Sequence, residues 1–205
     1  MPSVYDLKPK FQSLLRPLTR SLARHGVTAN QVTLLAALLS LLTGAVLVRF
    51  TEPRCLLLLP VVLALRMALN AIDGMLAREH NQKSSLGAIL NELGDGVSDS
   101  ALYLPLALWP GFPPGMVVLI VVLLLLGEMT GVVGVMIGAS RRYDGPMGKS
   151  DRAVVFGGLG LLLGLNLPIV PLVPYVLCLV AVLLILTIFN RARSALAELR
   201  GRALE

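Results

Sequence analysis

Charged residues are scarce in this chain. Only 15% of its 205 residues are Asp, Glu, Lys or Arg, whereas an average soluble domain has about 25%. Aromatic residues make up 5%, yet 56% of the chain is hydrophobic and the mean hydropathy is +0.79. Glycine follows no triplet period. The composition therefore excludes an ordinary water-soluble domain, disorder and a collagen-like repeat, and it indicates a helical bundle in a membrane.

Cysteine and histidine are also few. Cys55 and Cys178 lie far apart and form no Cys-x-x-Cys pair. Neither His25 nor His80 has a second histidine or a cysteine at ligand spacing. These absences argue against a zinc site, a redox motif and a disulfide framework.

The N-terminal region does not resemble a cleaved signal peptide, because cations interrupt its apolar positions. Those positions follow helical spacing: Phe11, Leu14, Leu15, Leu18 and Leu22. Cations occupy the positions between them: Lys10, Arg16, Arg20 and Arg24. The pattern predicts an amphipathic juxtamembrane helix over residues 1–27 that lies in the membrane interface.

Six apolar segments follow, each long enough to cross about 30 Å of hydrocarbon at 1.5 Å per residue. They lie near residues 31–50, 55–78, 86–108, 114–139, 152–168 and 171–190. The predicted fold is an all-α integral membrane protein, with six transmembrane helices over residues 28–205 preceded by the interfacial helix.

The basic residues predict the topology. Five precede the first segment, two lie between the second and third, four between the fourth and fifth, and four follow the sixth. Only Arg49 and Arg54 lie on the opposite side, and Arg66 lies within the second segment. Because Lys and Arg accumulate in cytoplasmic loops, both termini are expected in the cytoplasm. The net charge of +6 is thus an orientation signal, and no nucleic-acid partner is expected.

Polar residues gather in the second and third segments. Asn70, Asp73, Gly74 and Ala77 share one helical face, and Gly87, Asn91, Asp95 and Asp99 share another. The short connection between the segments predicts antiparallel neighbours, so that the two faces meet at the cytoplasmic end and the glycines allow close approach.

Charges within hydrocarbon are costly and point to function. Clustered carboxylates favour a hard divalent cation, Mg²⁺ or Mn²⁺, and a neighbouring Arg78 fits a site that binds phosphates. The alternative is a set of interhelical salt bridges with Arg66 and Arg78, which explains neither the glycines nor the regular spacing.

The stretch Asp73-Gly74-x-x-Ala77-Arg78-x8-Gly87-x3-Asn91-x3-Asp95 closely resembles the signature of the CDP-alcohol phosphotransferase (CDP-alcohol phosphatidyltransferase) family, D-x-x-D-G-x-x-A-R-x8-G-x3-D-x3-D. Residues 27–33 and 148–152 also resemble family regions, at the start of the first span and on the acceptor side. Asn at two of the four acidic positions resembles a bacterial inner-membrane branch of the family.

The resemblance implies a metal-dependent membrane enzyme of phospholipid biosynthesis. It would move a phosphatidyl group from a CDP-linked lipid such as CDP-diacylglycerol to a small alcohol and release CMP. The implied metal ligands are Asn70, Asp73, Asn91 and Asp95, with Asp95 also the general base; Gly74, Ala77, Arg78 and Gly87 bind the nucleotide. Lys149 and Arg152 match the acceptor side. The family also implies a homodimer in the cytoplasmic membrane, with the active site on the cytoplasmic side.

Asn70 and Asn91 depart from the signature, because each amide removes a negative charge and leaves one oxygen able to bind a metal. Asp99, one turn beyond Asp95, is the residue expected to compensate. Whether one or two metals bind, and which alcohol is the acceptor, stay open. The alternatives are a non-catalytic relative that binds CDP-lipid or metal and, less in keeping with charges gathered on one side, a transporter.

Overall fold

The computed structural model describes residues 4–202, and within that range it contains helices and no strands. The α-helices are α1 (Val4–Arg24), α2 (Ala29–Arg49), α3 (Leu58–Glu79), α4 (Ser85–Tyr103), α5 (Pro114–Met136), α6 (Lys149–Gly164) and α7 (Val173–Arg202). Short 3-10 helices at Pro53–Leu57, Leu104–Leu108 and Val170–Leu172 extend α3, α4 and α7. The predicted all-α class is confirmed.

Each of the six expected segments lies on a helix, but four helical stretches are long and apolar enough on their own to cross a membrane. These are Ala29–Arg49, Pro53–Glu79, Pro114–Met136 and Val170–Arg202. Helix α4 carries three acidic residues, and α6 has only 16 residues. Helix α7 continues 12 residues beyond the predicted end at 190, because the Ala, Leu, Arg and Glu that follow are strong helix formers.

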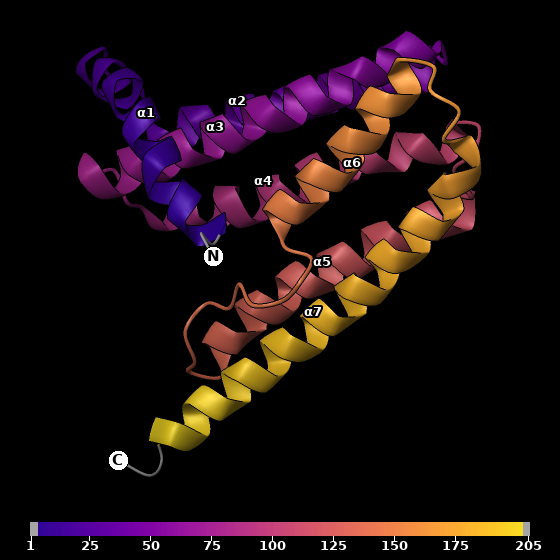
Figure 1. Cartoon of the computed structure of the whole chain (residues 1–205). Helices are drawn as coiled ribbons and strands as arrows, with labels where there is room; N and C mark the ends of the chain where they lie inside the picture. Colours follow the sequence, from indigo (N-terminus) through magenta and orange to yellow (C-terminus); the bar gives the residue numbers. More distant parts are fainter. Residues whose placement is uncertain (1–3, 203–205) are drawn as a thin grey trace.

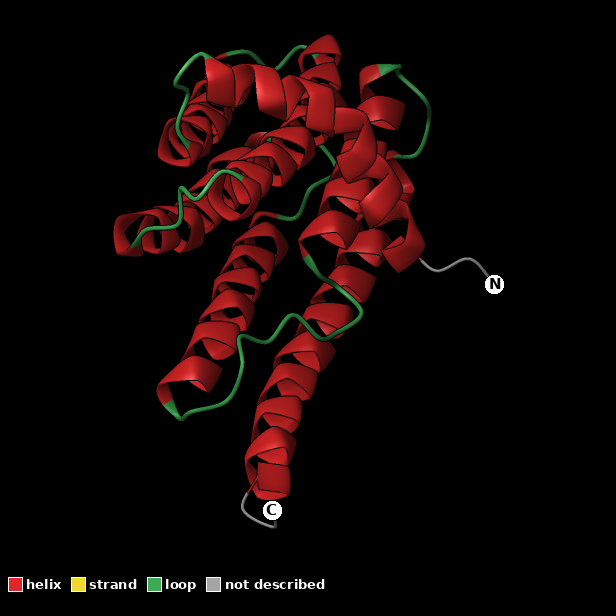
Figure 2. Ribbon diagram, turned by 90° about the vertical axis from the view of Figure 1, so that its left-hand side faces the viewer, coloured by secondary structure: helices red, strands yellow, loops and turns green. Residues whose placement is uncertain are grey.

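In Figure 1, α4 and α6 lie between a group formed by α1, α2 and α3 and the pair α5 and α7. Helix α2 packs extensively on α4 and also on α3, while α5 packs extensively on α7. Helix α6 lies against α3. Figure 2 shows the loop of residues 137–148, which we call the α5–α6 loop, extended along α7 before α6 begins.

A continuous apolar core joins these helices at the end away from α1. Tyr103 of α4 stacks on Phe156 of α6, with ring centroids 4.2 Å apart. The Trp109 indole nitrogen donates to the Leu47 carbonyl oxygen at 3.1 Å, which satisfies the polar atom of a buried side chain. This core fixes the far ends of the helices, so that their near ends present the polar residues.

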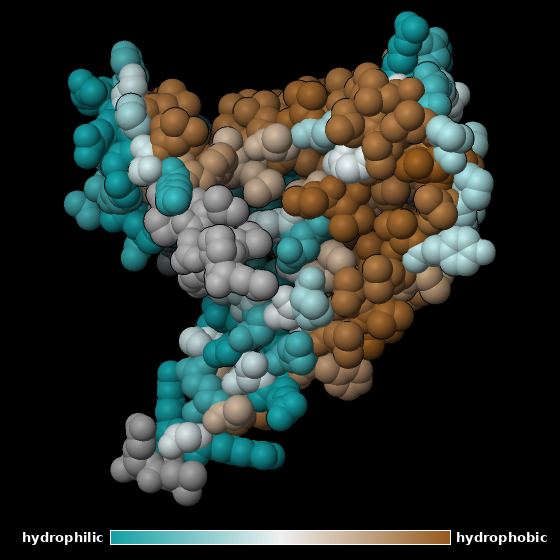
Figure 3. Space-filling model, in the orientation of Figure 1, coloured by the Kyte–Doolittle hydropathy of each residue, from teal (hydrophilic) through white to brown (hydrophobic). Residues whose placement is uncertain are grey.

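The outer surface of the bundle is apolar. A broad hydrophobic area covers the right-hand part of the molecule in Figure 3, and hydrophilic residues gather to the left and below. Only 33% of the residues in each membrane-span window are buried inside the protein. The large exposed side chains include Leu34, Leu38, Leu119, Leu126 and Leu179. Such an area far exceeds the patches of soluble proteins, and the chain is a membrane protein.

Helix α1 lies across the ends of α2 and α3 and has apolar residues on two sides. Leu15 and Leu22 pack on a small core that includes Met75 and Leu76 of α3. Arg16 forms a two-point ion pair with Glu79, at 2.9 and 3.1 Å. The remaining apolar positions of the predicted face are exposed: Phe11, Leu14 and Leu18. Helix α1 is therefore tied to the bundle and still presents an apolar surface.

Gly44 lets α2 approach α4 closely, because a Cβ atom there would lie 2.2 Å from the Ala101 carbonyl oxygen. We expect Gly44→Ala to separate the two helices and to destabilise the protein by about 1–3 kcal/mol, as overpacking commonly does. Thermal unfolding in detergent measures this as a lower midpoint.

Gly158→Ala in α6 is the matched control, since its Cβ would meet no atom within 4 Å. It should leave the midpoint unchanged or raise it slightly, because Ala favours a helix over Gly by about 0.5–1 kcal/mol. Equal midpoints for Gly44→Ala and the wild type would contradict the assigned close contact.

Candidate functional site

The polar faces of α3 and α4 border one space, but the two helices are not the packed neighbours that the sequence predicted. Each packs on α2, and they touch each other little. The Asn91 amide nitrogen of α4 lies 3.5 Å from an Asp73 oxygen of α3. Asn91 is one helical turn from Asp95, so Asp73 and Asp95 border the same polar space. The separation arises because α2 packs on both helices and takes the place that each was expected to offer the other.

Asp73 is held by neutral groups. Its side chain is almost enclosed, at 4% exposure, and one carboxylate oxygen accepts a hydrogen bond of 2.9 Å from the Thr33 hydroxyl of α2. The other contact is the Asn91 amide. Among residues 10–202, whose side chains the structure describes, no lysine, arginine or histidine forms an ion pair with Asp73. A buried carboxylate without a cation is costly, so this position favours a bound cation.

The signature glycines serve contacts other than the expected approach of α3 to α4. A Cβ atom at Gly74 would lie 2.9 Å from the Arg78 guanidinium, so Gly74 leaves room for that group to fold back over α3. A Cβ atom at Gly87 would lie 2.7 Å from the Asn30 side-chain oxygen of α2. Ala77 and Asn70, on the same face of α3, are half-buried.

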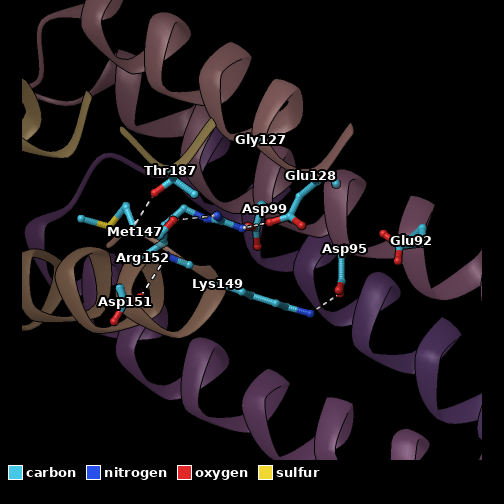
Figure 4. A network of polar contacts seen from close by, with 12 residues as sticks. Glu92, Asp95, Asp99, Gly127, Glu128, Met147, Lys149, Asp151, Arg152 and Thr187 are labelled. Atoms are coloured by element: carbon cyan, nitrogen blue, oxygen red, sulfur yellow. Dashed lines mark hydrogen bonds and ion pairs between the residues drawn. The ribbon is translucent and has the colours of Figure 1, made fainter. Parts of the chain in front are cut away.

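Asp95 is paired with a cation from α6. Lys149, the first residue of α6, forms an ion pair with an Asp95 oxygen (Figure 4). Arg66 of α3 approaches the same oxygen at 3.9 Å. The Asp95 side chain is 27% exposed, which leaves it within reach of a ligand. A lysine and a buried arginine thus both approach one oxygen of Asp95.

Asp99 is enclosed between two arginines. One of its oxygens accepts from Arg66 at 2.7 Å, and the other accepts from Arg152 at 2.8 and 3.2 Å. Asp99 and Arg152 are each 2% exposed. Both oxygens of Asp99 are therefore engaged, an arrangement different from the metal ligation that its place in the helix suggested. Arg152, expected on the acceptor side, is likewise enclosed by carboxylates.

Glu128 extends this network to the rest of the bundle. Its oxygens accept from Arg152 of α6 and from Arg191 of α7, both at 3.1 Å, and from Arg141 of the α5–α6 loop at 3.2 Å. Arg141 also forms a two-point contact with Glu92 of α4, at 2.8 and 2.9 Å. The polar end of the bundle is thus joined through paired charges, several of which Figure 4 shows.

The α5–α6 loop is fastened to α5 and α7. Arg142 pairs with Asp144 at 2.7 and 2.9 Å and with Glu198 at 3.1 Å; the hydrogen bond with Asp144 raises the pKa of Arg142. The Met147 backbone nitrogen donates to the Thr187 hydroxyl at 3.0 Å. These contacts hold the loop that leads into α6, and so place Lys149 at Asp95.

The residues that suit a divalent cation are Asp73 and Asp95, with the amide oxygens of Asn70 and Asn91. All offer hard oxygen donors, which Mg²⁺ and Mn²⁺ prefer. Within the described range, no three Asp, Glu, His or Cys side chains gather into a metal cluster. The donor set fits a cation that also takes oxygens from water or from a bound phosphate, as Mg²⁺ usually does.

Sequence reasoning left the contacts of five residues at this site unassigned: Thr33, Glu92, Glu128, Arg141 and Arg191. Thr33, which bonds Asp73, lies in the stretch 27–33 that resembles the family's entry to the first span, but nothing in that stretch pointed to Asp73. The Glu92–Arg141 pair joins α4 to the distant loop, and no local pattern predicts it. Glu128 had a signal, a charge in an apolar helix, but its partners were not readable. In the sequence, Arg191 was one of the basic residues that predict the cytoplasmic side, and nothing there indicated its partners.

Comparison with known proteins places the chain in a family. The model of the CDP-alcohol phosphatidyltransferase family matches residues 26–190. The chain is 48% identical over 194 residues to inner membrane protein YnbA of Escherichia coli (strain K12), covering 95% of this chain and 96% of that protein. It is 30% identical over 102 residues to archaetidylinositol phosphate synthase of Pyrococcus horikoshii, covering 50% and 52% of the two chains.

Solved structures show the same fold. The Mycobacterium tuberculosis phosphatidylinositol phosphate synthase (PgsA1) with CDP-DAG bound superposes with a TM-score of 0.71 at 22% identity, over 87% of this chain and 92% of that one. The complex of PgsA1 with manganese and citrate gives a TM-score of 0.70 at 23% identity, over 87% of each chain. With the family model matching most of its length, this chain belongs to the CDP-alcohol phosphatidyltransferase family.

Proposed function

We propose that this protein transfers a phosphatidyl group from a CDP-linked lipid, such as CDP-diacylglycerol, to a small alcohol and releases CMP. The observation that carries the proposal is the meeting of the signature residues of α3 and α4: the Asn91 amide lies 3.5 Å from the enclosed Asp73, one turn from the partly exposed Asp95. Gly74, Ala77 and Arg78 follow Asp73 on α3 and match the signature. Gly87 completes the nucleotide-binding positions. That a PgsA1 structure holds CDP-DAG supports a donor of this class.

Asp95 is the proposed general base. Its carboxylate takes the proton of the acceptor hydroxyl as the oxygen attacks the phosphorus that bears the diacylglycerol. A new P–O bond forms, the P–O bond to CMP breaks, and CMP keeps the bridging oxygen. Arg78 stabilises the charge on the leaving phosphate, and the helices hold both reactants in line.

A divalent cation, Mg²⁺ or Mn²⁺, is the proposed cofactor, held by Asp73 and Asp95 with the amide oxygens of Asn70 and Asn91. When bound, such an ion neutralises the pyrophosphate and stabilises its leaving group. The manganese in a PgsA1 structure supports this choice. Thr33 holds the Asp73 carboxylate in one orientation through its hydroxyl hydrogen bond.

Lys149 is the proposed acceptor-side cation, because its ammonium has three donors and can meet the acceptor while it holds Asp95. Arg152 and Asp99, expected among the binding residues, act instead as positioning residues. They bind each other and anchor α6, from which Lys149 extends.

The membrane placement follows the charges. We propose six spans, in which α4 and α6 also cross because their buried charges pair with neighbouring helices. Helix α1 lies in the interface on Phe11, Leu14 and Leu18. Both termini and the site face the cytoplasm of a bacterial cell, where CDP-lipid headgroups meet the inner membrane. We also propose a homodimer, on family resemblance.

Asp95→Asn should lower CMP release by about 10²–10⁴-fold, the usual contribution of a general base. The assay measures CMP released from CDP-diacylglycerol by purified protein with Mg²⁺ or Mn²⁺ and a panel of alcohols, and mass spectrometry identifies the lipid product. Glu52→Gln, an exposed carboxylate at the opposite end of α3, is the control and should keep full activity. No CMP release by the wild type with any alcohol would defeat the proposal.

Removing divalent cations with EDTA should abolish CMP release, because the pyrophosphate would then face two carboxylates without a bridging charge. Adding Mg²⁺ or Mn²⁺ in excess should restore it, whereas Ca²⁺ should restore less, since its larger and looser coordination suits this transfer poorly. Unchanged release in EDTA would show that the reaction needs no metal.

The amides at positions 70 and 91 favour one alternative, a non-catalytic relative that binds CDP-lipid or metal. The double variant Asn70→Asp with Asn91→Asp separates the two functions. For an active wild type we expect a change within about tenfold, since Asp73 and Asp95 are already present. A wild type that binds nucleotide without turnover, together with a large gain in the double variant, would establish the alternative.

A further inference from the structure

The two carboxylates of the site have different partners. Asp73 bonds a hydroxyl and an amide, which carry no charge. Asp95 contacts the Lys149 ammonium, with Arg66 3.9 Å away. Asp73 on α3 therefore has no cation at ion-pair distance among the described side chains, while Asp95 on α4 already has one.

Arg66 reinforces this difference. It is 3% exposed, and one guanidinium nitrogen donates to Asp99. Its Nε and Nη2 are buried with no hydrogen-bond partner, and Nη2 is the atom that approaches Asp95. Buried unpaired donors are costly, so this guanidinium favours an anionic neighbour and disfavours a further cation at the Asp95 oxygen that Lys149 already contacts.

The backbone of Lys149 is held at a fixed helix start. It begins α6, whose first turn is fixed by the Gly148 backbone nitrogen bonding Asp151 at 2.9 Å. Three residues later, Arg152 is tied to Asp99 and Glu128. The ammonium therefore projects from an anchored helix end onto Asp95, and a divalent ion at the same oxygen would meet a like charge at contact distance, where repulsion is strong.

We propose that Lys149 replaces a second divalent cation in this protein, so that the site holds a single divalent ion beside Asp73. The amides at Asn70 and Asn91 fit the replacement of a divalent ion by Lys149. The two remaining carboxylates carry two negative charges, which balance one ammonium and part of the charge of one divalent ion. The four acids of the signature carry four negative charges, which would balance two divalent ions. The inference rests on the divalent-ion site of the proposed function, and it assigns that site's stoichiometry and the residue that sets it.

The test counts Mn²⁺ bound per chain by equilibrium dialysis, with free Mn²⁺ measured by electron paramagnetic resonance, on the full-length protein in detergent. The wild type should bind one Mn²⁺. Asn70→Asp with Asn91→Asp and Lys149→Met should bind two. The matched control carries the same two Asn→Asp changes with Lys83→Met, in the exposed loop between α3 and α4, and should stay at one.

Two Mn²⁺ or none on the wild type would overturn the inference, and this measurement needs no variant to fold. Equal Mn²⁺ counts for the Lys149 and Lys83 variants would also overturn it, since the lysine would then not set the number. The proposed function fails separately: one bound Mn²⁺ without CMP release would sustain the inference and reject the transferase. Two bound Mn²⁺ together with CMP release would reject the inference and sustain the transferase.

Discussion

The pairing of buried carboxylates with arginines holds the polar end of this bundle together. Charges withdrawn from water are costly unless each meets a partner, and here five helices each contribute one member of a connected set: Arg66, Asp99, Glu128, Arg152 and Arg191. The pairs fix the position of α6 and of the loop before it. Removing one member would leave another charge buried alone.

This network also explains why the candidate site lies where it does. Asp99 and Glu128, deeper in the set, are saturated by guanidinium groups and are not available to a ligand. Asp73 and Asp95, on the α3 and α4 faces, retain unbalanced or accessible oxygens. The proposed chemistry therefore uses the outer pair, while the inner pair anchors α6, from which Lys149 extends.

Much of this was predictable from the order of residues. Apolar runs longer than a membrane is thick located the helices, and the four-residue spacing of Gly87, Asn91, Asp95 and Asp99 identified one polar face. The signature led to the family, which the comparisons confirm. The placement of α2 between α3 and α4 was not predictable, because helical periodicity shows which face is polar and not which helix it meets. The partners of Glu128 were hidden for the same reason.

The sequence by itself determined the all-helical class, the membrane environment, the family and the two faces that carry the acids, since these follow from composition and local spacing. Only the tertiary structure decided which partner each acidic side chain has. It gave Asp99 to two arginines, Asp95 to Lys149 and Asp73 to a hydroxyl. An ion pair depends on distance across the bundle, and residues 54 positions apart, such as Lys149 and Asp95, acquire that distance only when the helices pack.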